Sequence, residues 1–325
     1  MKTIRCLICL LAGSLLLAAA MATVAQQSYP SRPVRVVVSW APGGAADLIA
    51  RVAVQKLGEQ LGQQLFIDNR GGASGAIGTD LAAKSAPDGY TLLVGGVTEL
   101  VINPQLVKVP YDAVRDFAAV SPLAFGYYVL VVHPSLPAKS VKELVALAKA
   151  RPGEINYASG GSGSNLSLVA ELFKTKAGIN MTHIPYKGGG PAAMAVISGE
   201  AQAMFSTIAS ALPFVNSNRL VALALTGQKR SSLLPKVPTF AESDLSGMDV
   251  GLWFALLAPA ATPHEIIARL NVEVLKLAAT PDYRAQLEKL GFEPFTSSPE
   301  KFSAFMKTEI DTWGKVIKAA GIKAD

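Results

Sequence analysis

Apolar residues in the first third of the chain follow two alternating patterns, which glycine-rich turns separate. Residues 34–38 (VRVVV) are almost continuously apolar and β-branched, which predicts a strand buried on both faces of a parallel sheet. Residues 41–44 (APGG) then end the strand, because proline fixes φ and glycine adopts conformations closed to other residues. From Ala45 apolar side chains recur every three or four positions, which predicts a helix. Such a turn offers free N–H groups to an anion, although a plain βα turn would need the same glycines.

A second strand–turn–helix pattern occupies residues 155–173, far along the chain. Its turn, ASGG at residues 158–161, resembles the APGG turn of the first unit. A third glycine-rich turn at residues 71–78 leads into a helical run at residues 76–86. We therefore expect anion-binding turns in at least two distant parts of the chain.

The other elements predict an α/β fold. Apolar runs at residues 64–68 and 90–94 alternate with helical patterns, and a short helix is expected at residues 98–106. This alternation favours a parallel sheet with right-handed crossovers.

Two long apolar runs, at residues 117–133 and 250–259, indicate crossings of the chain between two lobes, because each ends at a proline before a helix. We predict an α/β protein of two lobes, rich in parallel strands, with these two interlobe crossings and a central cleft that a hinge closes. Lobe 1 is expected to comprise residues 26–125 and 255–325, and lobe 2 residues 126–254. The helices at the C-terminal end are expected to complete lobe 1.

The first 25 residues are not expected to belong to the fold. A basic start, an apolar run at residues 6–20 and a group of small residues form the pattern of a cleaved signal peptide at residues 1–25. Cleavage is expected after Ala25, with Ala22 as the alternative. The sequence therefore predicts a secreted chain.

Composition narrows the chemistry of the mature chain. The two cysteines of the full sequence, Cys6 and Cys9, both lie in the signal. The mature chain therefore has none, and we expect no disulfide, thiolate metal site or cysteine nucleophile in it. Removal of Lys2 and Arg5 with the signal reduces the 30 basic residues to 28 against 24 acidic ones, a net charge of +4. These charges are spread out, so we expect no nucleic-acid partner, whereas small anions are compatible ligands.

Motifs for catalysis are incomplete. His264 and Glu265 begin the zinc pattern H-E-x-x-H, but Ala268 takes the place of the second histidine. Ser162 follows two glycines, but Ser164 stands where G-x-S-x-G requires glycine, and no P-loop is present. The sequence therefore predicts a binding protein with no catalytic residue, metal or cofactor. A secreted α/β enzyme acting on a small organic acid is the alternative.

Longer motifs follow one another along the mature chain, among them SWAPGGAADLIARV, IDNRGGASGAIG, APDGYTLLVG, PYDAVRDFAAVSPL, YASGGSGSNLSLVAELF and HIPYKGGGPAAMAVISGEAQAMF. In this order they resemble the Bug-type receptors, the solute-binding components of tripartite tricarboxylate transporters. The resemblance covers essentially the whole mature chain. It implies a periplasmic protein similar to type II periplasmic binding proteins, which closes on a small carboxylate. It also implies delivery of that ligand to a membrane permease or, alternatively, to a sensor kinase, and we expect a monomer.

The resemblance also implies where the ligand binds. The matching residues are Gly43, Gly44, Ala45, Ala46, Asp47, Gly75, Ala76 and Thr98 in the first lobe, and Ser162, Gly163, Ser164, Asn165, Tyr186 and Ser206 in the second. The chain departs from the family pattern at Ser167, where histidine is usual, and at Ser206, where aspartate is common. Loss of that carboxylate weakens the assignment of an amino-bearing or hydroxyl-rich ligand.

Hydrogen-bond donors are what a buried carboxylate requires, because it loses its water on binding. The N–H groups of two helix starts, with the hydroxyls of Thr98, Ser162 and Ser164, can supply them. One lobe alone offers too few donors, so we expect ligand binding to close the cleft.

Four side chains near these turns leave their roles open. Asp47 is either a first-turn carboxylate that complements the helix dipole or an acceptor for a ligand group or water. Tyr186 belongs to the core or, as we favour, donates its hydroxyl to the ligand. Trp40 is wall or core, and Arg70 is a candidate partner for Asp47.

Overall fold

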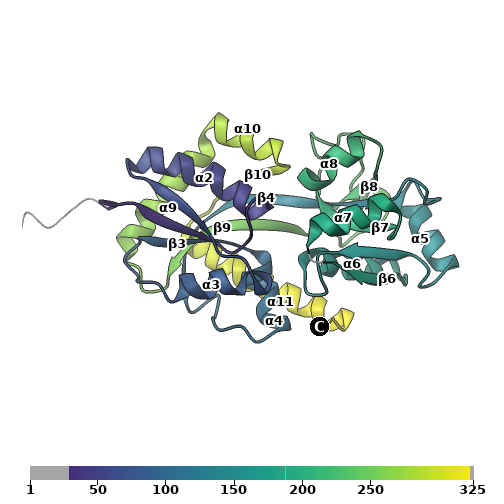
Figure 1. The fold of residues 1–325 in the computed structure, drawn as a ribbon, viewed down its shortest axis with the longest axis horizontal. Helices are drawn as coiled ribbons and strands as arrows, with labels where there is room; N and C mark the ends of the chain where they lie inside the picture. Colours follow the sequence, from purple (N-terminus) through teal and green to yellow (C-terminus); the bar gives the residue numbers. More distant parts are fainter. Residues whose placement is uncertain (1–28, 187, 323–325) are drawn as a thin grey trace, which may run out of the picture.

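Two lobes lie side by side in the computed structural model, which describes residues 29–186 and 188–322 (Figure 1). The predicted signal peptide at residues 1–25 lies outside the described residues. The elements at the start of the first lobe are β1 (Val34–Val38), α2 (Ala45–Leu61), β2 (Leu65–Asn69), η1 (Ala73–Gly75), α3 (Ala76–Ala83), β3 (Thr91–Gly96), η2 (Thr98–Ile102) and α4 (Asn103–Leu106).

Strand β1 lies between β2 and β3, and all three run parallel. Its four valines are completely buried, which confirms the strand predicted from their β-branched run. The short helix expected at residues 98–106 is present as a π-helical turn, η2, followed directly by the one-turn helix α4. Pro104 near the start of α4 lacks the N–H that a continuous α-helix would use.

The two predicted crossings are strands β4 (Phe117–Val132) and β9 (Gly251–Pro259), which pair antiparallel. Strand β4 pairs with β9 as far as Tyr127, and from Tyr128 it pairs with two strands of the second lobe. A single strand therefore passes from one lobe into the other, and every residue of β9 is buried. The predicted two-lobed α/β architecture is confirmed.

The second lobe is built in the same way as the first. Its elements are α5 (Val141–Ala150), β5 (Asn156–Ser159), α6 (Asn165–Ala177), β6 (Thr182–Pro185), α7 (Gly189–Ser198), β7 (Ala203–Thr207), α8 (Ile208–Asn216), β8 (Val221–Leu225) and η3 (Ala241–Ser243). Strand β5 runs parallel to its neighbours β6 and β7, whereas β7 and β8 are antiparallel to β4.

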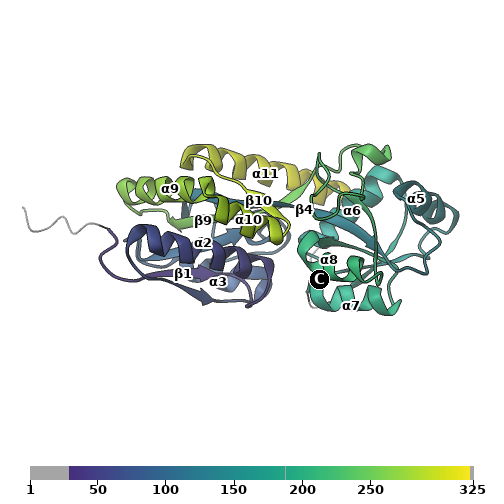
Figure 2. The same ribbon diagram turned by 90° about the horizontal axis from the view of Figure 1, so that it is seen from above.

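The C-terminal part returns to the first lobe with α9 (His264–Ala279), α10 (Pro281–Lys289) and β10 (Phe292–Pro294), and ends in α11 (Pro299–Ala320). Helix α11 does more than complete that lobe, because its far end packs against α6 of the second lobe (Figures 1 and 2). With 22 residues it is about 33 Å long, enough to reach both lobes. None of the helices in the described part of the chain has the length and apolar character needed to cross a bilayer.

Helix α3 packs unusually close to the end of β1, and Gly78 permits this approach. A Cβ atom on Gly78 would lie 2.6 Å from the main-chain oxygen of Arg70 and 2.9 Å from Cα of Ser39. Because both are backbone atoms, the helix would have to shift. We expect Gly78→Ala to lower the free energy of unfolding by about 1–3 kcal/mol in urea denaturation.

Gly190 provides the matched control for Gly78, since it is also helical but a Cβ atom added to it would have no neighbour within 4 Å. We expect Gly190→Ala to be as stable as wild type, or more stable by up to about 1 kcal/mol. Equal stability of the two variants would contradict the close packing of α3 against β1.

Candidate functional site

A cavity of about 450 Å³ opens between the two lobes. Its lining residues are Trp40, Ala41, Pro42, Gly43, Gly44, Ala45, Ala46, Gly96, Val97, Thr98, Glu99, Asn165, Leu166, Gly189, Gly190, Ser206, Thr207, Ser210, Leu252 and Phe254. A second hollow of about 320 Å³ shares five of these residues and adds Ser74, Asn103, Leu106, Val107, Gly160, Gly161, Ser162, Gly163, Ser164 and Gly188. The two hollows are therefore parts of one cleft. Lys187, which adjoins Gly188, lies outside the described residues.

The first-lobe turn brings main-chain N–H groups to this cleft. Helix α2 begins at Ala45, and its N-cap residue Gly44 provides no side chain that could satisfy them. Gly43 has φ of 84°, a left-handed conformation that glycine adopts without strain. The predicted turn residues from Gly43 to Ala46 all line the cavity. They form a main-chain surface that can receive a carboxylate.

Asp47 holds this turn in place from behind. Its carboxylate accepts hydrogen bonds from the main-chain N–H of Gly43 (2.9 Å), Nε of Arg51 (2.8 Å) and Nδ2 of Asn69 (3.0 Å). Burial alone would raise the pKa of Asp47, but these hydrogen bonds outweigh it and lower the pKa. Asp47 is 1% exposed and does not line the cleft, which favours a structural role over ligand contact.

The pairing of Arg70 with Asp47 that the sequence suggested is wrong. Nε of Arg70 lies 2.9 Å from a carboxylate oxygen of Asp68, its neighbour two residues earlier. The partner of Asp47 is Arg51, one turn further along α2, because residues four apart lie on the same side of a helix.

Glu99 is a site residue that the sequence analysis missed. Among the described residues that line the cleft, it is the one acidic or basic side chain. Its carboxyl group accepts hydrogen bonds from the N–H of Gly96 (2.7 Å) and from Nε1 of Trp40 (3.1 Å). Burial raises the pKa of Glu99 to about 7, although these hydrogen bonds oppose the shift. An acidic residue inside the apolar run VTELVI, directly after the predicted strand, was the available signal.

The second lobe contributes three helix starts. Ser164 caps α6 by accepting a hydrogen bond from the N–H of Ser167 (3.2 Å), and Nδ2 of Asn165 donates to the hydroxyl of Tyr128 in β4 (2.9 Å). Helix α7 begins at Gly189, and Thr207 caps α8. The cleft therefore meets the N-termini of four helices, α2 in the first lobe and α6, α7 and α8 in the second.

The predicted residues Thr98, Ser162, Gly163, Ser164, Asn165 and Ser206 all line the cleft. The side chains of Thr98 and Ser206 are 7% and 3% exposed, and within the described part of the chain their hydroxyls form no hydrogen bond. The hydroxyl of Ser167 donates to main-chain oxygens of its own turn, those of Ser162 (2.7 Å) and Ser164 (2.8 Å), and so takes no part in the lining.

Besides Asp47, three predicted residues do not reach the cleft. The hydroxyl of Tyr186 donates to Oε1 of Glu200 (2.8 Å) within the second lobe, so the structure corrects our expectation that it faces the ligand. Gly75 and Ala76 are buried and do not belong to the cleft lining. A Cβ atom on Gly75 would lie 2.9 Å from Cβ of Glu99, so this glycine makes room for the buried glutamate.

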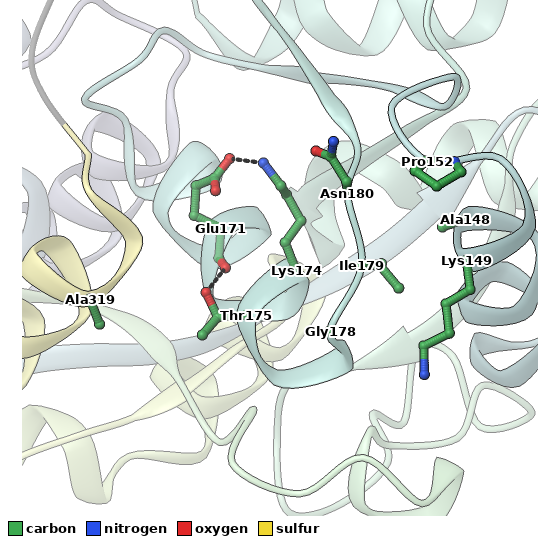
Figure 3. A pocket seen from close by; sticks show the side chains of 10 residues that line it. All are labelled: Ala148, Lys149, Pro152, Glu171, Lys174, Thr175, Gly178, Ile179, Asn180 and Ala319. Carbon is green, nitrogen blue, oxygen red and sulfur yellow. Dashed lines mark hydrogen bonds and ion pairs between the residues drawn. The ribbon is translucent and has the colours of Figure 1, made fainter.

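Another hollow, of about 480 Å³, lies where α6 approaches the end of α11 (Figure 3). Glu171 and Lys174 form an ion pair (2.7 Å) on its wall, and Thr175 donates to the main-chain oxygen of Glu171 (2.9 Å). None of the predicted site residues lines it. Within the described residues, no group of three or more His, Cys, Asp or Glu side chains is placed to hold a metal ion. The interlobe cleft is therefore the candidate site.

Known proteins share both the sequence and the fold of this chain. Residues 49–322 match the family described as the tripartite tricarboxylate transporter family receptor. Protein BugT of Bordetella pertussis is 36% identical over 304 residues, 93% of each chain. The structure of R. palustris Rpa4515 with adipate is 35% identical, with a TM-score of 0.85, and the match covers 92% of this chain and 100% of that one. The structure of MatC (Rpa3494) from Rhodopseudomonas palustris with bound malate is 30% identical, with a TM-score of 0.79. That match covers 89% of this chain and 100% of the other.

Proposed function

Because the chain belongs to the family of tripartite tricarboxylate transporter receptors, we propose that it is a periplasmic receptor that closes on one small carboxylate between its lobes. Since that family consists of receptors, the chain is a binding protein rather than an enzyme. The observation that carries the proposal is the cavity of about 450 Å³ onto which helices of both lobes open. Related proteins with adipate and with malate support a carboxylate ligand.

Main-chain N–H groups at helix N-termini hold the carboxylate in this proposal. A helix start contributes about 0.3–1 kcal/mol when exposed and up to about 2 kcal/mol when partly buried. Micromolar binding requires about 8 kcal/mol. Helix α2 of the first lobe cannot supply this alone, so the starts of α6, α7 and α8 in the second lobe must also bind the ligand. Ligand binding therefore closes the cleft about β4 and β9.

The partner in this proposal is the membrane permease of a tripartite tricarboxylate transporter, which takes the ligand from the closed receptor. The signal pattern at residues 1–25 supports export to the periplasm, where such a receptor works. Loss of carboxylate uptake on deletion of the gene, with restoration by the wild-type gene, tests this step.

Native mass spectrometry of freshly purified protein tests the binding step. We expect one small acid per chain, released on unfolding, because a cleft that closes on its ligand retains it. Small-angle scattering of the protein stripped of ligand and then saturated with that acid is expected to show a smaller radius of gyration. An unchanged radius would contradict closure, and conversion of the acid to a product would favour an enzyme.

A further inference from the structure

The second-lobe turn of the cleft is held from behind by Ser159, the last residue of β5. The hydroxyl oxygen of Ser159 accepts a hydrogen bond from the N–H of Gly161 (3.2 Å), as the carboxylate of Asp47 does from Gly43 in the first lobe. Gly161 lines the cleft with φ of 126°, a conformation that side chains other than glycine rarely permit. Because Ser159 is completely buried, its hydroxyl rather than solvent determines where this N–H points.

His183 of the neighbouring strand β6 is the second partner of that hydroxyl. Its Nε2 lies 2.6 Å from Oγ of Ser159, whereas the main-chain oxygen of Gly161 lies 3.0 Å from the same Oγ. The oxygen of Gly161 already accepts two hydrogen bonds from Ser164, one from its N–H (3.0 Å) and one from its Oγ (2.8 Å). Since a carbonyl oxygen has two lone pairs, the Ser159 hydroxyl donates to Nε2 of His183 and keeps its own lone pairs for the N–H of Gly161.

The ring of His183 is itself held in one orientation. Its Cα lies opposite that of Tyr157 in the register of β5 and β6, and the two rings stack with centroids 4.7 Å apart and 16° between their planes. The hydroxyl of Tyr157 donates to Glu171 of α6, whose carboxylate also pairs with Lys174 (2.7 Å; Figure 3). Because side chains two apart on a strand share a face, Tyr157 and Ser159 lie on one side of the sheet, where His183 contacts both.

From these contacts, and resting on the proposed function, we propose that His183 is a positioning residue for the ligand. Through Ser159 it holds the turn at residues 160–164 in the conformation that lines the cleft. Neither His183 nor Ser159 belongs to the lining, so the effect is indirect. A turn that is already ordered in the free protein loses less conformational freedom when the ligand binds, which increases the affinity.

Hydrogen exchange of the ligand-free protein tests the positioning without any ligand. His183→Asn has a side chain too short to reach Ser159, and we expect the main-chain amides of residues 160–164 to exchange about tenfold faster in it. His183→Gln carries an amide oxygen about as far from Cα as Nε2, so exchange is expected to stay within about threefold of wild type. The amides of residues 43–46 in the first-lobe turn are the internal reference and should not change. Equal exchange of residues 160–164 in the two variants would overturn the role of His183.

Ligand affinity is the second measurement. Isothermal titration calorimetry with succinate, malate and adipate identifies an acid that the wild type binds. We expect His183→Asn to bind this acid about tenfold more weakly, and His183→Gln to stay within about threefold of wild type. Unchanged affinity in His183→Asn would overturn the proposal. If the wild type bound none of the three acids and native mass spectrometry found no retained acid, the proposed function would fail, while hydrogen exchange would still decide whether His183 holds the turn.

His133 provides the matched control. It also contacts a serine, since its Nδ1 lies 2.7 Å from Oγ of Ser135, but neither residue lines the cleft. His133→Gln breaks this contact, because glutamine does not reproduce Nδ1. We expect wild-type affinity and wild-type exchange of residues 160–164 in this variant. An effect as large as that of His183→Asn would mean that any lost serine–histidine contact in the second lobe disturbs the turn, and would contradict a specific role for His183.

A double variant tests whether His183 acts through Ser159. Ser159→Ala removes the acceptor for the N–H of Gly161 and is expected to weaken binding about tenfold by itself. Adding His183→Asn should then weaken binding no further, because the two residues belong to one chain of hydrogen bonds. A loss of about a hundredfold, the product of the two single effects, would contradict this route. Thermal melting verifies that each variant folds. If Ser159→Ala does not fold, the comparison of His183→Gln with His183→Asn decides.

Discussion

Asp47→Asn is expected to lower the free energy of unfolding by about 2–4 kcal/mol and to weaken ligand binding at the same time. Asp47 accepts three hydrogen bonds through its two oxygens while it is 1% exposed. Asparagine has one acceptor oxygen, so its amide would face the donors of Arg51 or Asn69. The contribution of Arg51 is reduced by solvent, because its side chain is 55% exposed. Most of the loss therefore comes from buried donors without partners, and the turn at Gly43 loosens.

The pH dependence of this loss has a definite sign. Since the pKa of Asp47 in the folded protein lies below its ordinary value of 3.8, its stabilising effect is fully present above that pH. It disappears as the pH falls through the folded pKa. Urea denaturation is therefore expected to show a constant difference between wild type and Asp47→Asn from about pH 8 to pH 5, and a smaller difference below about pH 4.

Asp282→Asn is the matched control. Asp282 also lies in the first turn of its helix, α10, and pairs with a lysine, Lys56, at 3.0 Å. Its side chain is 58% exposed, so we expect a change within about 0.5 kcal/mol. Similar losses in the two variants would mean that any first-turn carboxylate has this effect and that Asp47 does not hold the ligand turn.

The strand–turn–helix units were predictable because their signals are local. Valines at residues 34–38, glycines at 41–44 and apolar spacing from Ala45 define the first unit without reference to the rest of the chain. The same holds for the unit that contains Ser164, since the cap of α6 comes from the residue that precedes it. Residues of these two turns accordingly line the cleft as expected.

Features that depend on contacts between distant segments were not predictable in this way. Glu99 is buried because Trp40, 59 residues earlier, and Gly75 pack over it, and no local pattern reveals that environment. The hydroxyl of Tyr186 donates to Glu200, 14 residues further on, and the family resemblance that placed Tyr186 at the ligand gives no sign of this contact. Helix α11 contacts both lobes, which its amphipathic pattern alone does not indicate.

Glu99→Gln is expected to remove much of the pH dependence of stability above pH 5. The pKa of Glu99 is raised from 4.5 to about 7 in the folded protein, so folding binds a proton between these values. Stability is therefore highest below the unfolded pKa and falls by about 3 kcal/mol as the pH rises through 7. Glutamine cannot ionise, so above pH 8 the variant is expected to be more stable than wild type. The amide of glutamine would face the indole N–H of Trp40, and the loss of that hydrogen bond is expected to reduce the gain in stability by about 1 kcal/mol.

Other titratable groups could also contribute to the pH dependence of stability that is measured for Glu99→Gln. The hydroxyl of Tyr111 donates to the main-chain oxygen of Glu99 (2.6 Å), and burial raises its pKa, so it stays neutral throughout the range. Burial also raises the pKa of Glu309, which accepts a hydrogen bond from Trp253 (3.2 Å) and contributes a slope of the same sign. Glu309→Gln is therefore the control, and it should retain the part of the slope near pH 7 that belongs to Glu99.

Ligand affinity is also expected to depend on the protonation state of Glu99. Because an ionised Glu99 in the cleft wall repels a carboxylate, wild-type affinity for a bound acid is expected to fall as the pH rises through about 7. Glu99→Gln should bind that acid with nearly constant affinity from pH 6 to about pH 8, as measured by calorimetry. A wild-type affinity that does not change over this range, or a variant that follows the wild-type curve, would show that Glu99 does not sense the ligand. With the expected result, the carboxyl group that fixes Trp40 against the cleft also couples ligand binding to uptake of a proton.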